Sequence, residues 1–65
     1  MNEVIFLNSK NRVICQMFMS ADDIYLLIAN SFACDCIYDY DSEDDAWHFW
    51  GIKSDILSLI NSLYD

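Results

Sequence analysis

Residues 2–19 hold two short segments in which apolar and β-branched side chains dominate. Residues 2–8 (NEVIFLN) and 12–19 (RVICQMFM) have this composition, which is typical of β-strands. The Ser-Lys-Asn between them, at positions 9–11, is small and polar, as turns usually are. The pattern therefore predicts an antiparallel hairpin formed by residues 2–8 and 12–19.

The next segment changes to a pattern that favours a helix. Ser20 precedes an apolar run that extends to about Asn30, and its hydroxyl suits an N-cap, with Asp23 three residues later as a capping-box partner. Asp22 and Asp23 also suit the positive end of a helix dipole. These two acids thus have a structural reason to be present, and we assign them no function.

Residues 31–41 (SFACDCIYDYD) alternate between two kinds of side chain, which predicts a strand with one solvated face. One face would carry Phe32, Cys34, Cys36, Tyr38 and Tyr40, and the other Ala33, Asp35, Ile37, Asp39 and Asp41. Residues 42–45 (SEDD) then form a turn. The return strand begins at Ala46 and sends Trp47 and Phe49 to one side and His48 and Trp50 to the other, until Gly51 ends it.

The last segment has helical spacing. Ser54 is placed to cap residues 55–65, in which Ile56, Leu59, Ile60 and Leu63 recur at helical intervals. No proline and no Gly/Ser-rich stretch marks a boundary, so residues 1–65 are expected to form a single domain. The predicted fold is α+β in the order ββαββα, a small antiparallel β-sheet with two helices on one face.

Charge adds a functional indication. The net charge is −8, from eleven acids and three cations, and the forty residues from Val13 to Ile52 contain eight acids but no Lys or Arg. Such an imbalance favours a cationic partner and disfavours direct binding to nucleic acid, because phosphates would be repelled. No apolar run reaches the roughly 18 residues of a membrane span, and no signal-peptide pattern is present. The expected location is the cytoplasm.

Metal sites and catalysis are not expected. A calcium loop starting at Asp39 would need Gly and Glu where Asp44 and Trp50 stand. Zinc ligation by Cys15, Cys34, Cys36 and His48 lacks recognisable ligand pairs, and buried packing explains these cysteines more simply. A 65-residue chain with one glycine has no room for a substrate cleft or an oxyanion hole. We therefore predict a protein without cofactors that is not an enzyme.

The candidate binding surface is the second hairpin. Carboxylates at positions i and i+2 of a strand lie about 6.6 Å apart on one face, and a row of them imitates the phosphates of DNA, of which each strand carries one per roughly 3.4 Å of helix axis. Nearby aromatic side chains would anchor a partner. The predicted partner-binding residues are Asp35, Asp39, Asp41, Glu43, Asp44, Asp45, Tyr40, Trp47 and Trp50.

Taken whole, with its DYDSEDD acidic run and its AWHFW aromatics, the chain resembles small phage-encoded anti-CRISPR proteins, in particular inhibitors of type I-C systems. The resemblance implies binding to the large subunit of the Cascade surveillance complex in a bacterial host, at the site that reads protospacer-adjacent DNA. The partner would be a basic nucleic-acid-binding protein. An alternative is an immunity or antitoxin-like protein that plugs a basic effector without imitating DNA.

Overall fold

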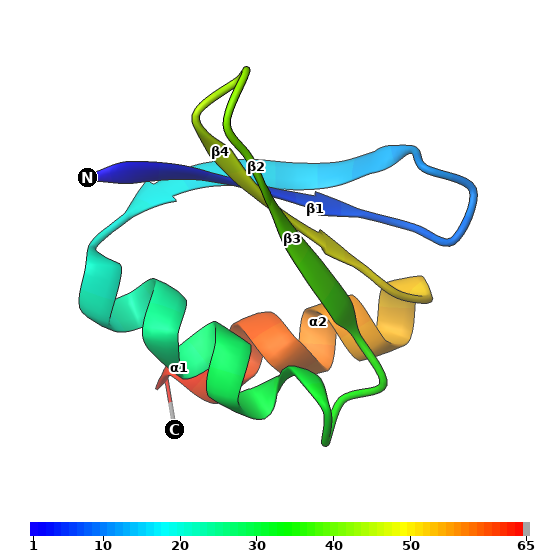
Figure 1. The fold of residues 1–65 in the computed structure, drawn as a ribbon. Helices are drawn as coiled ribbons and strands as arrows, with labels where there is room; N and C mark the ends of the chain where they lie inside the picture. The colour runs from blue at the N-terminus through cyan, green and yellow to red at the C-terminus, as the bar shows by residue number, and fades with distance from the viewer. Residues whose placement is uncertain (65) are drawn as a thin grey trace.

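The computed structural model describes residues 1–64, which fold into four strands and two helices. The strands are β1 (Asn2–Leu7), β2 (Val13–Met19), β3 (Ile37–Asp41) and β4 (Ala46–Trp50), and the helices are α1 (Ala21–Ser31) and α2 (Lys53–Asn61), with a 3-10 turn at Ser62–Tyr64. The strands form one sheet, and both helices cover the same face of it (Figure 1). The predicted α+β class, element order and one-sided placement of the helices are confirmed. None of the described helices has the length and apolar character needed to cross a membrane.

The sheet is mixed, so the prediction of an antiparallel sheet is wrong. Its strand order is β2-β1-β4-β3. The two hairpins are antiparallel, but the central strands β1 and β4 are parallel. The cause is α1, which carries the chain beneath the sheet to its opposite end (Figure 1), as a connection between parallel strands must. As a result, the β1–β2 and β3–β4 turns lie at opposite ends of the sheet.

The core lies between the sheet and the helices. Val4 and Phe6 of β1 stand beside Trp47 and Phe49 of β4 in the parallel register. Phe6 and Phe49 are fully buried and stack with their ring centroids 5.7 Å apart. Four helix residues close the core from below, namely Ile24, Leu27, Ile56 and Leu59. Burying a side chain of this size stabilises the fold by about 1.5–3 kcal/mol.

The two helices begin differently. The predicted Ser20 cap is confirmed, since the Asp23 N–H donates to the Ser20 hydroxyl oxygen at 3.3 Å. The predicted Ser54 cap is wrong, because α2 begins at Lys53 with Ile52 in the N-cap position and no side-chain cap. The first turn of α2 is closed by a backbone bond from Ile56 N–H to the Ile52 carbonyl (3.0 Å), and burial of Ile56 holds this helix against the sheet.

The strand predicted for residues 31–41 is shorter in the structure, because its first six residues do not extend. The backbone N–H groups of Cys34 and Cys36 both donate to the Ser31 carbonyl, at 3.2 and 2.9 Å, so the chain turns here instead of extending. Asp35 has a φ of 53°, in the left-handed region that Asp tolerates better than most residues. The strand begins only at Ile37. Cys34 and Asp35 therefore belong to a turn, and Asp35 does not extend the acidic row of β3.

Candidate functional site

The face of the sheet opposite the helices, here called the open face, is not covered by any element of residues 1–64 (Figure 1). The predicted alternation is confirmed there, because Asp39 and Asp41 of β3 lie opposite His48 and Ala46 of β4. The open face carries Phe18 and Gln16 of β2, Ile5 and Leu7 of β1, His48 and Trp50 of β4, and Ile37, Asp39 and Asp41 of β3. Phe18 and Ile37 are 63% and 68% exposed, which is unusual for apolar side chains of a sheet.

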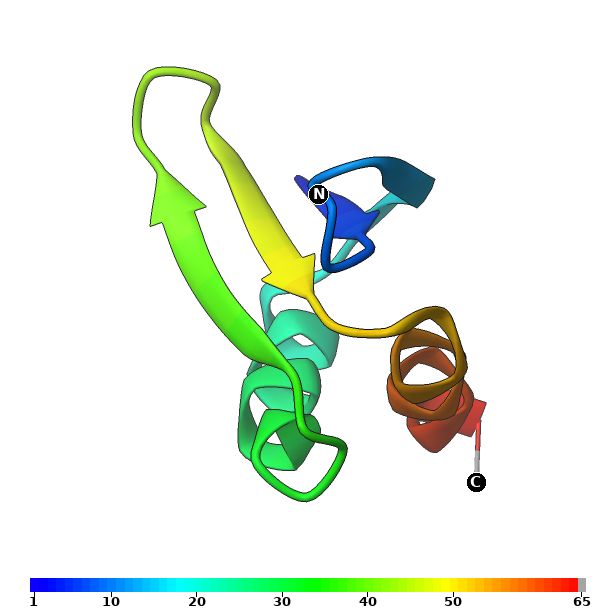
Figure 2. The same ribbon diagram turned by 90° about the vertical axis from the view of Figure 1, so that its right-hand side faces the viewer.

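Five carboxylates cluster on the β3–β4 hairpin, here called the acidic hairpin: Asp39, Asp41, Glu43, Asp44 and Asp45. The turn of this hairpin extends beyond the rest of the sheet, at the end away from the helices (Figures 1 and 2). No Lys or Arg occurs anywhere in residues 37–50. The hairpin therefore presents a concentrated negative charge at the edge of the molecule.

The acids shape the turn that displays them. One carboxylate oxygen of Asp41, Oδ1, accepts from the N–H groups of Glu43 (2.9 Å) and Asp44 (3.3 Å). Asp45 adopts a φ of 52°, and its carboxylate accepts a hydrogen bond from the Tyr40 hydroxyl. That hydrogen bond is the main cause that raises the pKa of Tyr40 above its usual value. The turn thus has a defined shape even though it is exposed.

Not all predicted site residues come together. Trp47 lies on the helix side of the sheet, where its ring packs against the rings of Tyr38 and Tyr40, with centroid separations of 6.3 and 5.3 Å. Asp35 lines a hollow of about 660 Å³ together with Trp50, Ile37 and Ile52, and no carboxylate of the acidic hairpin lines it. Of the predicted aromatic anchors, Trp50 is the one placed on the open face with the carboxylates of β3.

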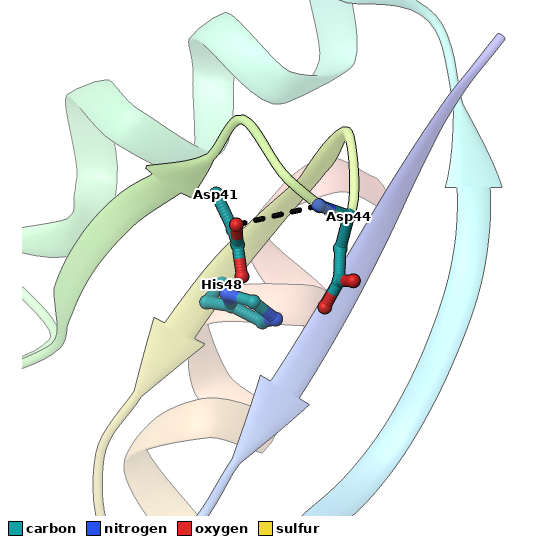
Figure 3. Close-up of side chains that lie close together, drawn as sticks. All are labelled: Asp41, Asp44 and His48. Atoms are coloured by element: carbon teal, nitrogen blue, oxygen red, sulfur yellow. Dashed lines mark hydrogen bonds between the residues drawn. The ribbon is translucent and has the colours of Figure 1, made fainter.

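The structure adds His48, which is absent from the predicted binding residues and was considered only as a zinc ligand. Asp41, Asp44 and His48 bring one ligating atom each to within 4.8 Å of one another (Figure 3). Two carboxylates and an imidazole at this spacing have the donor types of a divalent cation site, and they also suit an N–H donor from a partner. The strand alternation had placed His48 on this face but gave no reason to couple it to Asp44.

The cysteines do not take part in a comparable cluster. Among residues 1–64, the side chains close enough to share a metal ion are Asp41, Asp44 and His48, and no cysteine is among them. Cys15 pairs with Phe6 and so faces the helices, whereas His48 pairs with Ile5 on the open face. A site formed by Cys15 and His48 is thus ruled out by the sheet itself.

A shallow hollow of about 500 Å³ runs over the open face between the two hairpin turns. It is lined by Leu7, Asn11, Asp39, Tyr40, Asp41, Ser42, Glu43, His48 and Trp50. The indole N–H of Trp50 donates to the side-chain oxygen of Asn11 at 2.8 Å. The centroids of the Trp50 and His48 rings are 5.5 Å apart. Asn11 was missed because it is 39 residues away from Trp50 in the sequence.

The uncompensated charge leads to a prediction about stability. We expect the melting temperature to rise when NaCl is increased from about 20 to 200 mM, because screening weakens repulsion among the acids within a Debye length. Thermal melts followed by circular dichroism measure this. A melting temperature that falls with added salt would mean that attractive pairs dominate instead.

Cys36 provides a second prediction. Its side chain is buried and lies close to Gly51, where an added Cβ would come within 3.0 Å of the thiol sulfur. Burial is the main cause that raises the pKa of Cys36 to about 11, and Cys34, Asp55 and Asp35 add to it. Because the unfolded thiol loses its proton near pH 9 and the folded one keeps it, stability should fall as pH rises from 9 to 11.

The same shift should protect Cys36 from alkylation, since the thiolate is the reactive form. In native protein at pH 8, iodoacetamide should modify Cys36 at least about ten times more slowly than in urea. Mass spectrometry of the Cys36 peptide reports the rate. Equal rates in native and unfolded protein would show that the thiol is accessible and not protected by burial.

Comparison with known proteins gives no relative for this arrangement. No protein-family model matches the chain, and neither a curated protein nor a solved structure matches it significantly.

Proposed function

We propose that this protein is an inhibitor that occupies a basic DNA-binding surface of another protein by imitating DNA. The observation that carries the proposal is the acidic hairpin, which bears five carboxylates on β3 and on a turn that extends beyond the rest of the sheet, with no cation among residues 37–50. A surface lined with Lys and Arg attracts such a hairpin over long range, which speeds encounter.

The spacing of the carboxylates supports imitation of a phosphate backbone. Asp39 and Asp41 point to the same face of β3, and side chains two residues apart on a strand are about 6.6 Å apart. The phosphates of one DNA strand advance about 3.4 Å along the helix axis per nucleotide, so two nucleotides advance by about 6.8 Å along that axis. Glu43 and Asp44 continue the charge around the turn.

In its finer form, the proposal names the target as a bacterial type I-C Cascade complex, bound in the host cytoplasm at the large subunit that reads protospacer-adjacent DNA. This form rests on the overall resemblance to anti-CRISPR proteins. Mobility-shift measurements with purified Cascade and target duplex test it. We expect stoichiometric inhibitor to abolish the shifted DNA band, and an unchanged band at excess inhibitor contradicts the assignment to Cascade.

A second candidate is a plug that binds a basic effector by ordinary surface complementarity. The exposed apolar side chains of the open face, Phe18 and Ile37 above all, favour it, because DNA presents no such surface to its binding protein. The two candidates differ in one outcome. A DNA mimic and DNA exclude each other, whereas a plug forms a ternary complex with the effector and its DNA.

A further inference from the structure

We infer that the hollow on the open face is a binding site for an arginine side chain of the partner. The inference deepens the proposed function and rests on it in one respect, since a basic DNA-binding surface is what would present the arginine. The site itself consists of residues from both hairpins, several of which lie outside the acidic run that the sequence singled out.

The floor of the hollow is aromatic and held in place. Trp50 and His48 line it, with their ring centroids 5.5 Å apart. The Trp50 indole is fixed by its hydrogen bond to Asn11, and the turn that holds Asn11 is itself fixed, because the Asn8 side chain accepts from the N–H groups of Lys10 and Arg12. An aromatic side chain that is already immobilised costs little entropy when a ligand binds against it.

The wall of the hollow is anionic. Asp39, Asp41 and Glu43 line it, and none of its lining residues is a Lys or Arg. Asp39 uses Oδ1 to accept from the Tyr40 N–H (2.9 Å), and Asp41 also uses Oδ1 for its turn bonds. Within residues 1–64, the Oδ2 atoms of Asp39 and Asp41 accept no hydrogen bond, so both can accept one from an incoming donor.

This combination of groups suits a guanidinium better than an ammonium. A guanidinium is planar and weakly hydrated, stacks on aromatic rings and donates in a fork that matches carboxylates. An ammonium is strongly hydrated and binds as a point charge, so an apolar, aromatic floor benefits it less. The hollow should therefore prefer arginine to lysine, which a purely electrostatic surface would not.

The test uses the purified protein and two peptides, Ac-Gly-Arg-Gly-NH2 and Ac-Gly-Lys-Gly-NH2, followed by ¹⁵N NMR. The indole N–H signals of Trp50 and Trp47 report separately on the open face and the helix side of the sheet. We expect the arginine peptide to shift the Trp50 signal saturably and to leave the Trp47 signal in place. The lysine peptide should bind at least about threefold more weakly, by about 0.65 kcal/mol.

Two matched variants locate the effect. Asp39→Asn with Asp41→Asn removes two charges from the hollow while keeping the Oδ1 acceptors, and it should abolish the Trp50 shift. Asp22→Asn with Asp23→Asn removes the same charge from the start of α1, outside the hollow, and it should leave the shift intact. A shift that survives the first variant, affects both tryptophans equally or is the same for lysine overturns the inference.

A zinc titration of the same sample tests the other occupant that the geometry allows. If Zn²⁺ at one equivalent shifts the His48 and Trp50 signals while the arginine peptide shifts neither of them, the hollow is a metal site and the arginine assignment is wrong. Because no partner protein is present, the result is independent of the proposed function. Arginine binding without inhibition of Cascade defeats only the assignment to Cascade, and inhibition without arginine binding defeats only this inference.

Discussion

Replacing charges on the acidic hairpin should weaken partner binding at least a hundredfold. The variant combines Asp39→Lys, Asp44→Lys and Asp41→Asn, since asparagine keeps the Oδ1 atom that accepts from Glu43 and Asp44. Repulsion replaces attraction at two positions and attraction is lost at a third, which should cost about 3 kcal/mol, mostly through slower association. Surface plasmon resonance against the basic partner measures the rate constants.

The control is Asp22→Asn with Asp23→Asn, at the exposed start of α1. It should bind within about threefold of the unmodified protein, because these acids lie away from the hairpin and their role is to stabilise the helix start. The hairpin variant must also keep its circular dichroism spectrum and melting temperature. If it folds and still binds normally, the carboxylates of β3 serve only to keep an edge strand from pairing with other chains.

The largest effect on folding is expected from Phe49→Ala. Phe49 is fully buried, and its ring centroid lies 5.7 Å from that of Phe6 and 5.8 Å from that of Tyr38. Removing such a ring costs about 3–5 kcal/mol, which is as much as the core of a domain below 70 residues usually supplies. We therefore expect the variant to be largely unfolded at 25 °C in urea titrations followed by circular dichroism.

Phe18→Ala is the matched control, because it deletes the same side chain from the open face. Phe18 is 63% exposed, and surface substitutions of this kind change the free energy of unfolding by about 0.5 kcal/mol or less. Similar losses for the two variants would mean that the open face, and not the helix side, supplies the packing. A stable Phe18→Ala protein that binds its partner poorly would instead identify Phe18 as an interface residue.

The pattern of the sequence was sufficient for the order of the elements but not for all of their ends or for the pairing of the strands. Both hairpins and the Ser20 helix start follow from local periodicity and capping, which act over a few residues. The parallel contact between β1 and β4 joins strands more than 40 residues apart, and nothing in either strand specifies its direction relative to the other. It depends instead on where α1 delivers the chain.

Only part of the candidate site could be predicted, because local patterns do not specify contacts between distant residues. The shared face of Asp39 and Asp41 follows from strand alternation and is confirmed. Asp35 was predicted to continue that row because residues 32–36 were expected to alternate between the two faces of a strand. In the structure the Ser31 carbonyl accepts hydrogen bonds from this segment, which places Asp35 in a turn before β3. The contact between Asn11 and Trp50, which shapes the hollow, exists only after the sheet has formed.

Ordered addition of DNA and the protein to Cascade shows whether the acidic hairpin binds where DNA binds. Cascade is immobilised, saturated with target duplex, and then exposed to the protein, and the added mass is compared with that on DNA-free Cascade. We expect strong binding to the free complex and at least about tenfold less to the DNA-loaded one, since both ligands need the same cationic surface. Equal binding to both would contradict this expectation, because the protein and DNA would then occupy separate sites.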